Sequence, residues 1–351
     1  MTGSTTRGLI GDSVLSHLPR RLGHKPIALL GDTNVDVVLD IDGLPAPGGD
    51  ALATSQTVGV GGSATNTAVL LHRLGAGVEL LSSVGDDPWS VLAREALVAE
   101  GVGVGHVTSV HGAGTSLNVV AVTPDGERTM LACRGASALL EAADIPDEVV
   151  ASGAWLHLSG YALLQDPQRS AALHALAIAV ASGVPTSMDL PVGPSATTRE
   201  VVLEALKGLH LLILGTPEAM QLLGDEQVSS SHESLVDRLH LLGPAVVALK
   251  LGAAGAVLAD DTGVIQVPSV PVAPLDTTGA GDAFSAGMVA GLAAGLSLEE
   301  TGALATLCGA AAVLRRGAGR NMPSTDDLRR LSLGSADFDG RHSAAPPSEQ
   351  P

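Results

Sequence analysis

Short apolar segments alternate along most of the chain with longer segments that are amphipathic or rich in small residues. We predict buried strands for the first kind and helices for the second. The strands are expected at 26–31, 155–159, 185–189, 209–214, 245–249 and 256–259, and helices at 89–100, 198–208, 217–223 and 298–315, with others starting near 167 and 279. This alternation predicts an α/β fold with a mostly parallel central sheet and helices on both of its faces.

Two polar segments interrupt the alternation. Residues 37–58 contain two strand-like stretches around a Pro-Gly break, and residues 117–133 hold two strand-like stretches around the turn sequence TPDGE. Strands joined by such a turn are typical of a hairpin. The two segments are therefore expected to form one small accessory β-sheet.

The two ends of the chain carry the weakest signals. Residues 1–25 are expected to be an N-terminal tail, or a short leading helix outside the core, and they show no apolar stretch of the kind that an export signal has. Residues 334–351 have little to bury and are expected to be disordered. The apolar stretch 241–259 is interrupted by Pro244 and Lys250, so we interpret it as strand, glycine turn and strand rather than a membrane span.

Composition restricts the partners. Hydrophobic residues make up 45% of the chain but aromatic ones only 1%, so Leu, Val and Ala must build the core. A net charge of −18 makes nucleic acid and anionic membranes poor partners. Cys133 and Cys308 show neither metal-ligand spacing nor a disulfide framework, which is consistent with a reducing cytoplasm.

The segment DTTGAGDAF at 276–284 carries the strongest chemical signal. Gly279, Ala280 and Gly281 have almost no side chains and precede a predicted buried helix, so their N–H groups can bind an anion at the helix N-terminus. We call these three residues the anion hole. Asp282 lies in the first helical turn beside them. A base next to an anion hole is what phosphoryl transfer to a hydroxyl group requires; the alternative is an ordinary helix start after a glycine turn.

A second group of candidate residues follows the first predicted strand and the small polar one. Asp36 lies just past a strand end, where α/β sheets bind ligands, and its carboxylate can accept from two sugar hydroxyls; an Asx-turn is the alternative. Gly61 and Gly62 allow the backbone to approach a small ligand, and Asn66 can both donate and accept. Arg134 would suit an acidic group on the substrate, with a salt bridge as the alternative.

Two further motifs suggest other classes of enzyme. Gly59, Gly61 and Ala64 match the G-x-G-x-x-A dinucleotide fingerprint, which would indicate an NAD-dependent oxidoreductase. The stretch before Gly59 is polar, however, and an earlier strand has already passed. Gly11-Asp12-Ser13 is similar to a hydrolase nucleophile block, but too few apolar residues precede it to form the required strand.

Together these motifs resemble the ribokinase-like (PfkB) family of carbohydrate and nucleoside kinases, over about residues 26–330. DTTGAGDAF resembles the C-terminal signature of that family, and GVGGSATNTAVLLHRLG at 59–75 resembles its N-terminal glycine signature. The resemblance implies a ribokinase-like fold. It also implies that strands at about 37–58 and 117–133 form a lid over the sugar, through which two subunits pair as a homodimer.

The resemblance implies a role for each matching residue. Asp282 would be the catalytic base, with the anion hole beside it. The sugar-binding residues would be Asp36, Gly61, Gly62 and Asn66, with Arg134 beside them; the nucleotide-binding residues would be Lys250, Gly252, Gly255 and Thr278.

The cation sites are less complete. Glu218 would order the waters of Mg²⁺, although Gly215 replaces the usual Asn of the Asn-x-x-Glu motif. Asp276 and Thr278 match positions where some members bind K⁺, whereas Asn321 replaces a Ser common in ribokinases.

These expectations give one functional hypothesis and two alternatives. The chain is expected to be a cytoplasmic kinase that uses ATP and Mg²⁺, with K⁺ as an activator, to phosphorylate a hydroxymethyl group of a small sugar or sugar derivative. A nucleoside kinase on the same fold is the nearer alternative, and an NAD-binding oxidoreductase the more distant one. The sugar itself is not defined, because Asp36 and Asn66 can hold any vicinal diol.

Overall fold

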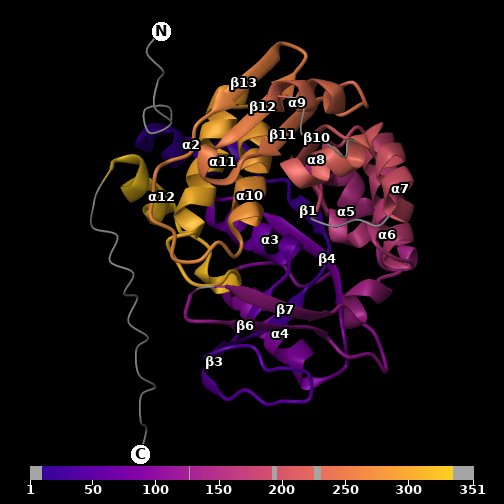
Figure 1. Cartoon of the computed structure of the whole chain (residues 1–351). Coiled ribbons are helices and arrows are strands. Elements are labelled where there is room, and N and C mark those ends of the chain that lie inside the picture. Colours follow the sequence, from indigo (N-terminus) through magenta and orange to yellow (C-terminus); the bar gives the residue numbers. More distant parts are fainter. Residues whose placement is uncertain (1–9, 126, 192–195, 225–230, 335–351) are drawn as a thin grey trace, which may run out of the picture.

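The computed structural model describes residues 10–125, 127–191, 196–224 and 231–334. Its centre is a nine-stranded sheet with the order β13-β12-β11-β10-β9-β8-β1-β4-β5 (Figure 1). The strands from β5 to β11 run parallel, and β12 and β13 add an antiparallel edge. Their bounds are β1 Ile27–Leu30, β4 Val78–Val84, β5 Val107–Ser109, β8 Trp155–Ser159, β9 Thr186–Asp189, β10 Leu211–Gly215, β11 Val246–Lys250, β12 Ala256–Asp260 and β13 Gly263–Val267.

Helices cover both faces of this sheet, as the alternation predicted. In β1, Ile27 and Leu29 point into one core, while Ala28 and Leu30 point into the other. The first core is closed by α2 Asp12–Leu22, α3 Ser63–Arg73, α4 Pro88–Ala99, α10 Ala280–Ala293, α11 Leu298–Ala312 and α12 Thr325–Ser332. The second is closed by α5 Asp147–Ser152, α6 Gln168–Ala181, α7 Ala196–Leu206, α8 Thr216–Leu223 and α9 His232–His240. In the described part of the chain, no helix has the length and apolar character needed to cross a membrane.

The N-terminal helix corrects one expectation. Residues 10–22 belong to the core, because Leu15 and Leu18 are each only 1% exposed and pack in the same cluster as α3 and α10. The leucines at 15, 18 and 22 form one apolar stripe, which the charged and proline residues between them conceal in the sequence. Asp12 and Ser13 begin this helix instead of ending a buried strand, so the hydrolase block is excluded.

Four strands form the predicted small sheet, which we call the small sheet throughout. Its order is β3-β2-β6-β7, with bounds β2 Asn34–Ile41, β3 Ala53–Gly61, β6 Ser116–Val122 and β7 Arg128–Cys133. Because only three residues separate the end of β1 from β2, the small sheet extends directly from the carboxyl edge of the large one (Figure 1).

Helix α10 is held in place by close backbone packing. A Cβ at Gly287 would lie 2.5 Å from Ala305 Cα, and one at Gly291 would lie 2.7 Å from Thr301 Oγ1. Only glycine at these two positions allows α10 to lie this close to α11. The packing fixes the N-terminus of α10 at the carboxyl edge of the sheet.

Candidate functional site

The anion-hole residues surround the start of α10. Gly279 is the N-cap residue with φ +75°, and a Cβ there would lie 2.8 Å from Ala318 Cβ. Glycine is therefore required both for the conformation and for the space. The first N–H groups of a helix have no partner within the helix. The structure changes the predicted set of donors, because the Ala280 N–H donates to the Thr277 carbonyl over 3.3 Å. The N–H groups of Gly281 and Asp282 have no partner in the described residues, so they can donate to a bound anion.

Asp282 is held beside these donors by Asn66. The Asn66 amide donates to Asp282 Oδ2 over 2.7 Å, and its Oδ1 accepts the Gly319 N–H over 2.8 Å. Burial raises the pKa of Asp282, although hydrogen bonds from Asn66 and Ser63 oppose the shift. A carboxylate of raised pKa is a better proton acceptor than an ordinary one. Asn66, expected to bind the ligand, here uses both ends of its amide to orient the base.

Asp36 lies on β2, on the face of the small sheet that borders a cleft. Asn118 on the neighbouring β6 donates to Asp36 Oδ1 over 2.8 Å. Gly61 leaves room for the other oxygen, since a Cβ there would lie 2.1 Å from Asp36 Oδ2. Burial raises the pKa of Asp36 to about 6; the Asn118 hydrogen bond lowers it and the charge of Asp282 raises it further. The two predicted carboxylates are therefore near enough to interact electrostatically.

The glycine segment before α3 is not a dinucleotide fingerprint. Gly59 and Gly61 lie on β3, which pairs antiparallel with β2 in the small sheet. A dinucleotide fold places that fingerprint after a buried parallel strand. Gly62, at φ +104°, approaches the chain itself, because a Cβ there would lie 2.2 Å from the Asp32 carbonyl oxygen. These observations overturn the oxidoreductase alternative.

Arg134 forms a buried ion pair with Asp32. Its Nε and Nη2 donate to the two carboxylate oxygens of Asp32 over 3.1 and 2.9 Å, and Asp32 is only 6% exposed. Gln168 bonds to both partners. Arg134 therefore forms the salt bridge that was the alternative to a substrate contact in the sequence analysis, and this salt bridge is buried rather than on the surface. Nη1 of Arg134 is buried and has no partner within the described residues.

Lys250 extends from the end of β11 to the same edge of the sheet. Its Nζ lies 2.6 Å from Asp189 Oδ1, and Ser285 on α10 donates to Asp189 Oδ2 over 2.7 Å. A Cβ at Gly281 would lie 3.4 Å from this ammonium group, so Lys250 brings a positive charge next to the anion hole. Asp189 and Ser285 had no signal in the sequence, because they meet Lys250 only through the packing of α10 on the sheet.

The glycines after Lys250 form a tight turn into β12. Gly252 and Gly255 have φ values of +57° and +100°, which other residues rarely adopt. A Cβ at Gly255 would lie 2.1 Å from the Val267 carbonyl oxygen on β13. The turn therefore has a structural requirement for glycine in addition to any contact with a nucleotide.

Glu218 is the strongest candidate for a magnesium contact. It lies in the first turn of α8 and is 4% exposed, and its carboxylate makes no hydrogen bond or ion pair in the described part of the chain. A Cβ at Gly215 would lie 2.6 Å from Glu218 Oε2. Glycine in place of the usual Asn therefore leaves room for the Glu218 carboxylate in this position. Among the described residues, no group of three or more metal-binding side chains exists. One carboxylate fits Mg²⁺, which keeps most of its waters and binds substrate phosphates.

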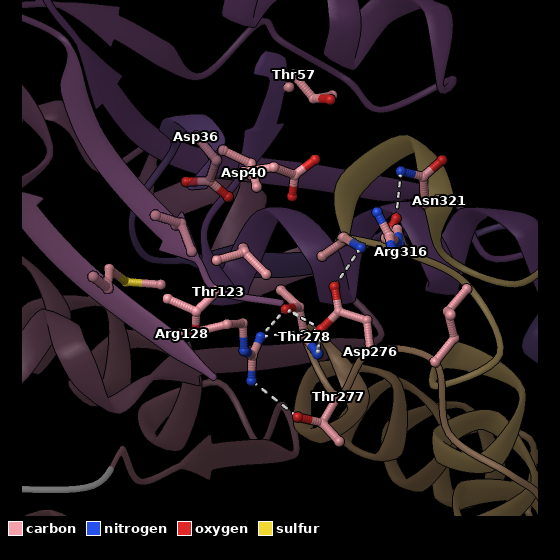
Figure 2. A pocket seen from close by; sticks show the side chains of 18 of the residues that line it. Asp36, Asp40, Thr57, Thr123, Arg128, Asp276, Thr277, Thr278, Arg316 and Asn321 are labelled. Carbon is pink, nitrogen blue, oxygen red and sulfur yellow. Dashed lines mark hydrogen bonds and ion pairs between the residues drawn. The ribbon is translucent and has the colours of Figure 1, made fainter. Parts of the chain in front are cut away.

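Asp276 and Thr278 lead into the anion hole and are tied together. Asp276 Oδ1 accepts the Thr278 N–H over 2.9 Å and the Thr278 hydroxyl over 2.7 Å, while Oδ2 accepts the Gly317 N–H over 2.8 Å. Arg128 of the small sheet lies 3.2 Å from Oδ1 (Figure 2). Burial alone would raise the pKa of Asp276, but these hydrogen bonds and the charge of Arg128 hold it below its ordinary value.

A cleft of about 760 Å³ separates the small sheet from this segment; we call it the sheet cleft. Asp36 and Arg128 line it from the small sheet, and Asp276 and Asn321 line it from the other side (Figure 2). Neither Asn118 nor Arg128 was singled out from the sequence. Both act through partners more than eighty residues away, which local patterns do not reveal.

Comparison with known proteins identifies the family of this α/β protein. The family model described as pfkB family carbohydrate kinase matches residues 25–325. The fructokinase of Klebsiella pneumoniae is 33% identical over 319 residues, which cover 87% of this chain and 98% of that one. The ATP-dependent ribose-1-phosphate kinase of Halopiger xanaduensis is 34% identical over 298 residues, covering 84% and 94%. Arabidopsis thaliana ribokinase complexed with ribose and ATP is similar with a TM-score of 0.75 and 25% identity, over 88% of this chain and 99% of that one.

The chain therefore belongs to the pfkB family of carbohydrate kinases, and it is an ATP-dependent carbohydrate kinase. The ribokinase-like fold implied by the sequence motifs is confirmed. Kinases of this family use ATP and Mg²⁺.

Proposed function

We propose that this kinase transfers the γ-phosphoryl group of ATP to a hydroxymethyl group of a small neutral sugar, with Asp282 as general base. The observation that supports this most is the position of Asp282. Its carboxylate lies in the first turn of α10, beside N–H groups that have no partner in the described part of the chain, and near enough to Asp36 to raise the pKa of that carboxyl. This arrangement provides a proton acceptor and an anion site within one small volume.

In the proposed mechanism each group has a separate task. Asp36 accepts hydrogen bonds from sugar hydroxyls and thereby orients the sugar. Asp282, positioned by Asn66, takes the proton of the reacting hydroxyl. The N–H groups at the start of α10 stabilise the charge on the transferred phosphoryl group, and the Lys250 ammonium group, held by its ion pair with Asp189, lies next to them and can donate to that group.

The cofactors are proposed on the same geometry. Glu218 would hold Mg²⁺ through its waters, and the ion would supply positive charge to neutralise the nucleotide phosphates. The turn at Gly252 and Gly255, together with Thr278, would lie against the nucleotide. Because ATP is abundant in the cytoplasm, we place the enzyme there.

Fructose is the first substrate to test. The relative from Klebsiella pneumoniae is named a fructokinase and matches over nearly its whole length. Arg134 is neutralised by Asp32, which favours neutral sugars over the acid sugars that the sequence suggested. A nucleoside remains the second candidate, because a structure of adenosine kinase from Sinorhizobium meliloti has a TM-score of 0.72 at 25% identity.

The test is an ADP-release assay with a panel of substrates at fixed ATP and Mg²⁺. The panel contains fructose, ribose, ribose 1-phosphate, gluconate and adenosine. We expect the highest kcat/KM with a neutral sugar, and the product should carry the phosphate on a hydroxymethyl carbon by NMR. A higher kcat/KM for adenosine would replace the proposal with a nucleoside kinase.

We also propose K⁺ activation and a homodimer. Asp276 and Thr278 flank the entry to the anion hole, where a monovalent cation would fix the backbone donors. Replacing Na⁺ by K⁺ at constant ionic strength should therefore raise kcat. An equal rate in both salts would contradict K⁺ activation. The homodimer is proposed to form through the small sheet.

A further inference from the structure

Arg128 connects the small sheet to the residues that precede the anion hole. It lies at the start of β7, and its guanidinium group reaches three consecutive residues across the sheet cleft. Nη1 contacts Asp276 Oδ1 and the Thr278 hydroxyl, and Nη2 donates to Thr277 Oγ1 over 2.9 Å (Figure 2). A single side chain thus binds every residue between Leu275 and Gly279.

The carboxylate that Arg128 pairs with organises the surrounding backbone. Asp276 fixes the N–H of Thr278 on one side and the N–H of Gly317 on the other. Gly317 precedes Ala318, whose side chain borders the N-cap Gly279. Asp276 therefore joins both segments that surround the start of α10, and within the described residues its cationic partner is Arg128. An isolated surface ion pair would contribute little, but this one controls groups that set the anion-hole geometry.

Arg128 and Asp36 belong to the same hydrogen-bonded sheet. Arg128 pairs with Val122 on β6, and Val122 pairs with Asp40 on β2, four residues beyond Asp36. Because these strands are bonded along their length, a displacement of the strand that carries Asp36 displaces Arg128 with it. The substrate-facing carboxylate and the arginine at the anion hole are thus two points on one rigid unit.

We propose that Arg128 is a positioning residue that transmits the position of the small sheet to the anion hole. When the small sheet occupies its place over the sugar, Arg128 binds Asp276, Thr277 and Thr278 and orders the backbone donors for phosphoryl transfer. When the sheet moves away, the segment loses its cation and the donors lose their fixed geometry. This rests on the proposed phosphoryl transfer, whose residues it joins.

The test compares Arg128→Ala with a matched control, Arg320→Ala. Arg320 lines the same cleft, but its guanidinium group has no ion pair or hydrogen bond among the described residues. Arg128→Ala should lower kcat about tenfold, the effect expected for losing hydrogen bonds of one charged side chain, with KM for ATP changed less. Millimolar guanidinium should restore part of that activity, whereas Arg320→Ala should keep wild-type kcat and show no rescue.

Amide hydrogen exchange tests the coupling without relying on turnover. In the wild-type protein, the best-binding sugar should slow exchange both in the small sheet and at residues 276–282. In Arg128→Ala the small sheet should still be protected, while residues 276–282 should not. If both regions respond in the variant as in the wild type, or if kcat stays within twofold, the proposal is overturned.

A second variant covers the case in which Arg128→Ala does not fold. Thr277→Val keeps the shape of its side chain and removes only the acceptor for Nη2, so kcat should fall about threefold. Arg128→Lys is then measured alone and together with Thr277→Val. The decrease in kcat of the double variant should be smaller than the product of the two single decreases, because both substitutions remove the same contact between Arg128 and Thr277. Independent, multiplicative effects would refute the coupling. If the wild-type protein phosphorylates no substrate of the panel, the proposed function fails instead, and the exchange experiment alone decides on Arg128.

Discussion

Asp282 is the residue on which the proposed chemistry depends most. Asp282→Asn keeps the size of the side chain but cannot take a proton. We expect kcat to fall roughly 10²- to 10⁴-fold, the typical cost of removing a general base. ATP and sugar should still bind, because the variant removes an interaction that matters mainly in the transition state. Single-turnover phosphoryl transfer, with calorimetric ATP binding and the Tm as controls, measures this; turnover within a few-fold of wild type would reduce Asp282 to a helix-start residue.

Asp36 gives the protein a pH dependence of known sign. Burial raises its pKa to about 6, so below that pH the free enzyme carries a protonated Asp36 that accepts fewer sugar hydrogen bonds. The kcat/KM for sugar should therefore decrease by up to about tenfold per pH unit below this value. A profile with no transition attributable to Asp36, when compared with that of Asp36→Asn, would contradict this role.

The same shift predicts the stability of the folded state. Because the folded protein holds the Asp36 proton more tightly than the unfolded chain, this group favours folding at low pH. That contribution is lost as the pH rises from about 4 to above 6. Asp36→Asn has no such titration, so urea unfolding should show the variant gaining stability relative to wild type across this window. A constant difference between the two proteins would mean that Asp36 titrates normally.

At the level of single residues, the sequence predicted groups whose chemistry is local. Asp282 and the anion hole follow one another in the chain, and helix physics alone places them together. The side chains that orient these groups could not be predicted from the local sequence. Asn118, Asp189 and Arg128 reach the site by strand pairing and by packing between distant segments. For Arg134 the sequence left two roles open, a substrate contact and a salt bridge. It could not decide between them because the partner, Asp32, lies 102 residues away in the chain.

Among the elements, the small sheet is the one whose function can be tested directly. Its strands are partly solvent-accessible, and β7 is exposed along its whole length. If it acts as a lid, addition of sugar should slow amide exchange in β2, β3, β6 and β7, because closure removes their backbone groups from water. Exchange measured with and without fructose tests this. Protection confined to the large sheet would remove the lid assignment.

The elements that the sequence left out share a physical cause. Helix α2 was assigned outside the core because its apolar residues are only a narrow stripe among charges, and its burial depends on a groove formed by α10 and α12. Helix α9 and strand β13 were also not predicted. β13 is short and half-exposed, and pairing with β12 rather than its own composition defines it. Strand β1, in contrast, is buried at every position, and α10 is buried from Ala283 to Gly291, so their apolar composition predicted them directly.

For the whole molecule, the parallel sheet followed from the alternation of elements, but the assembly state depends on a surface that only the strand register reveals. Val58, Val37, Val119 and Leu131 form one apolar row across all four strands of the small sheet. Residues of one strand alternate between faces, so Val37, Val119 and Leu131 lie opposite the cleft that Asp36 borders, whereas Val58 on β3 also lines that cleft. Leu131 is 69% exposed. A continuous apolar row on an exposed sheet is typical of a protein interface.

This row predicts a homodimer in which two small sheets pack against each other. The wild-type protein should sediment at twice its chain mass of 35.1 kDa at micromolar concentration. Leu131→Asp places a charge at the exposed end of the row, on the edge strand β7, and should shift the equilibrium to the monomer, since burying an unpaired carboxylate is strongly unfavourable. Leu241→Asp is the matched control, because Leu241 is 84% exposed at the end of α9, away from the small sheet. Sedimentation equilibrium on the three proteins decides. A monomeric wild-type protein would contradict the homodimer. Equal dissociation by both substitutions would exclude pairing through the small sheet, because Leu131 lies on that sheet and Leu241 does not.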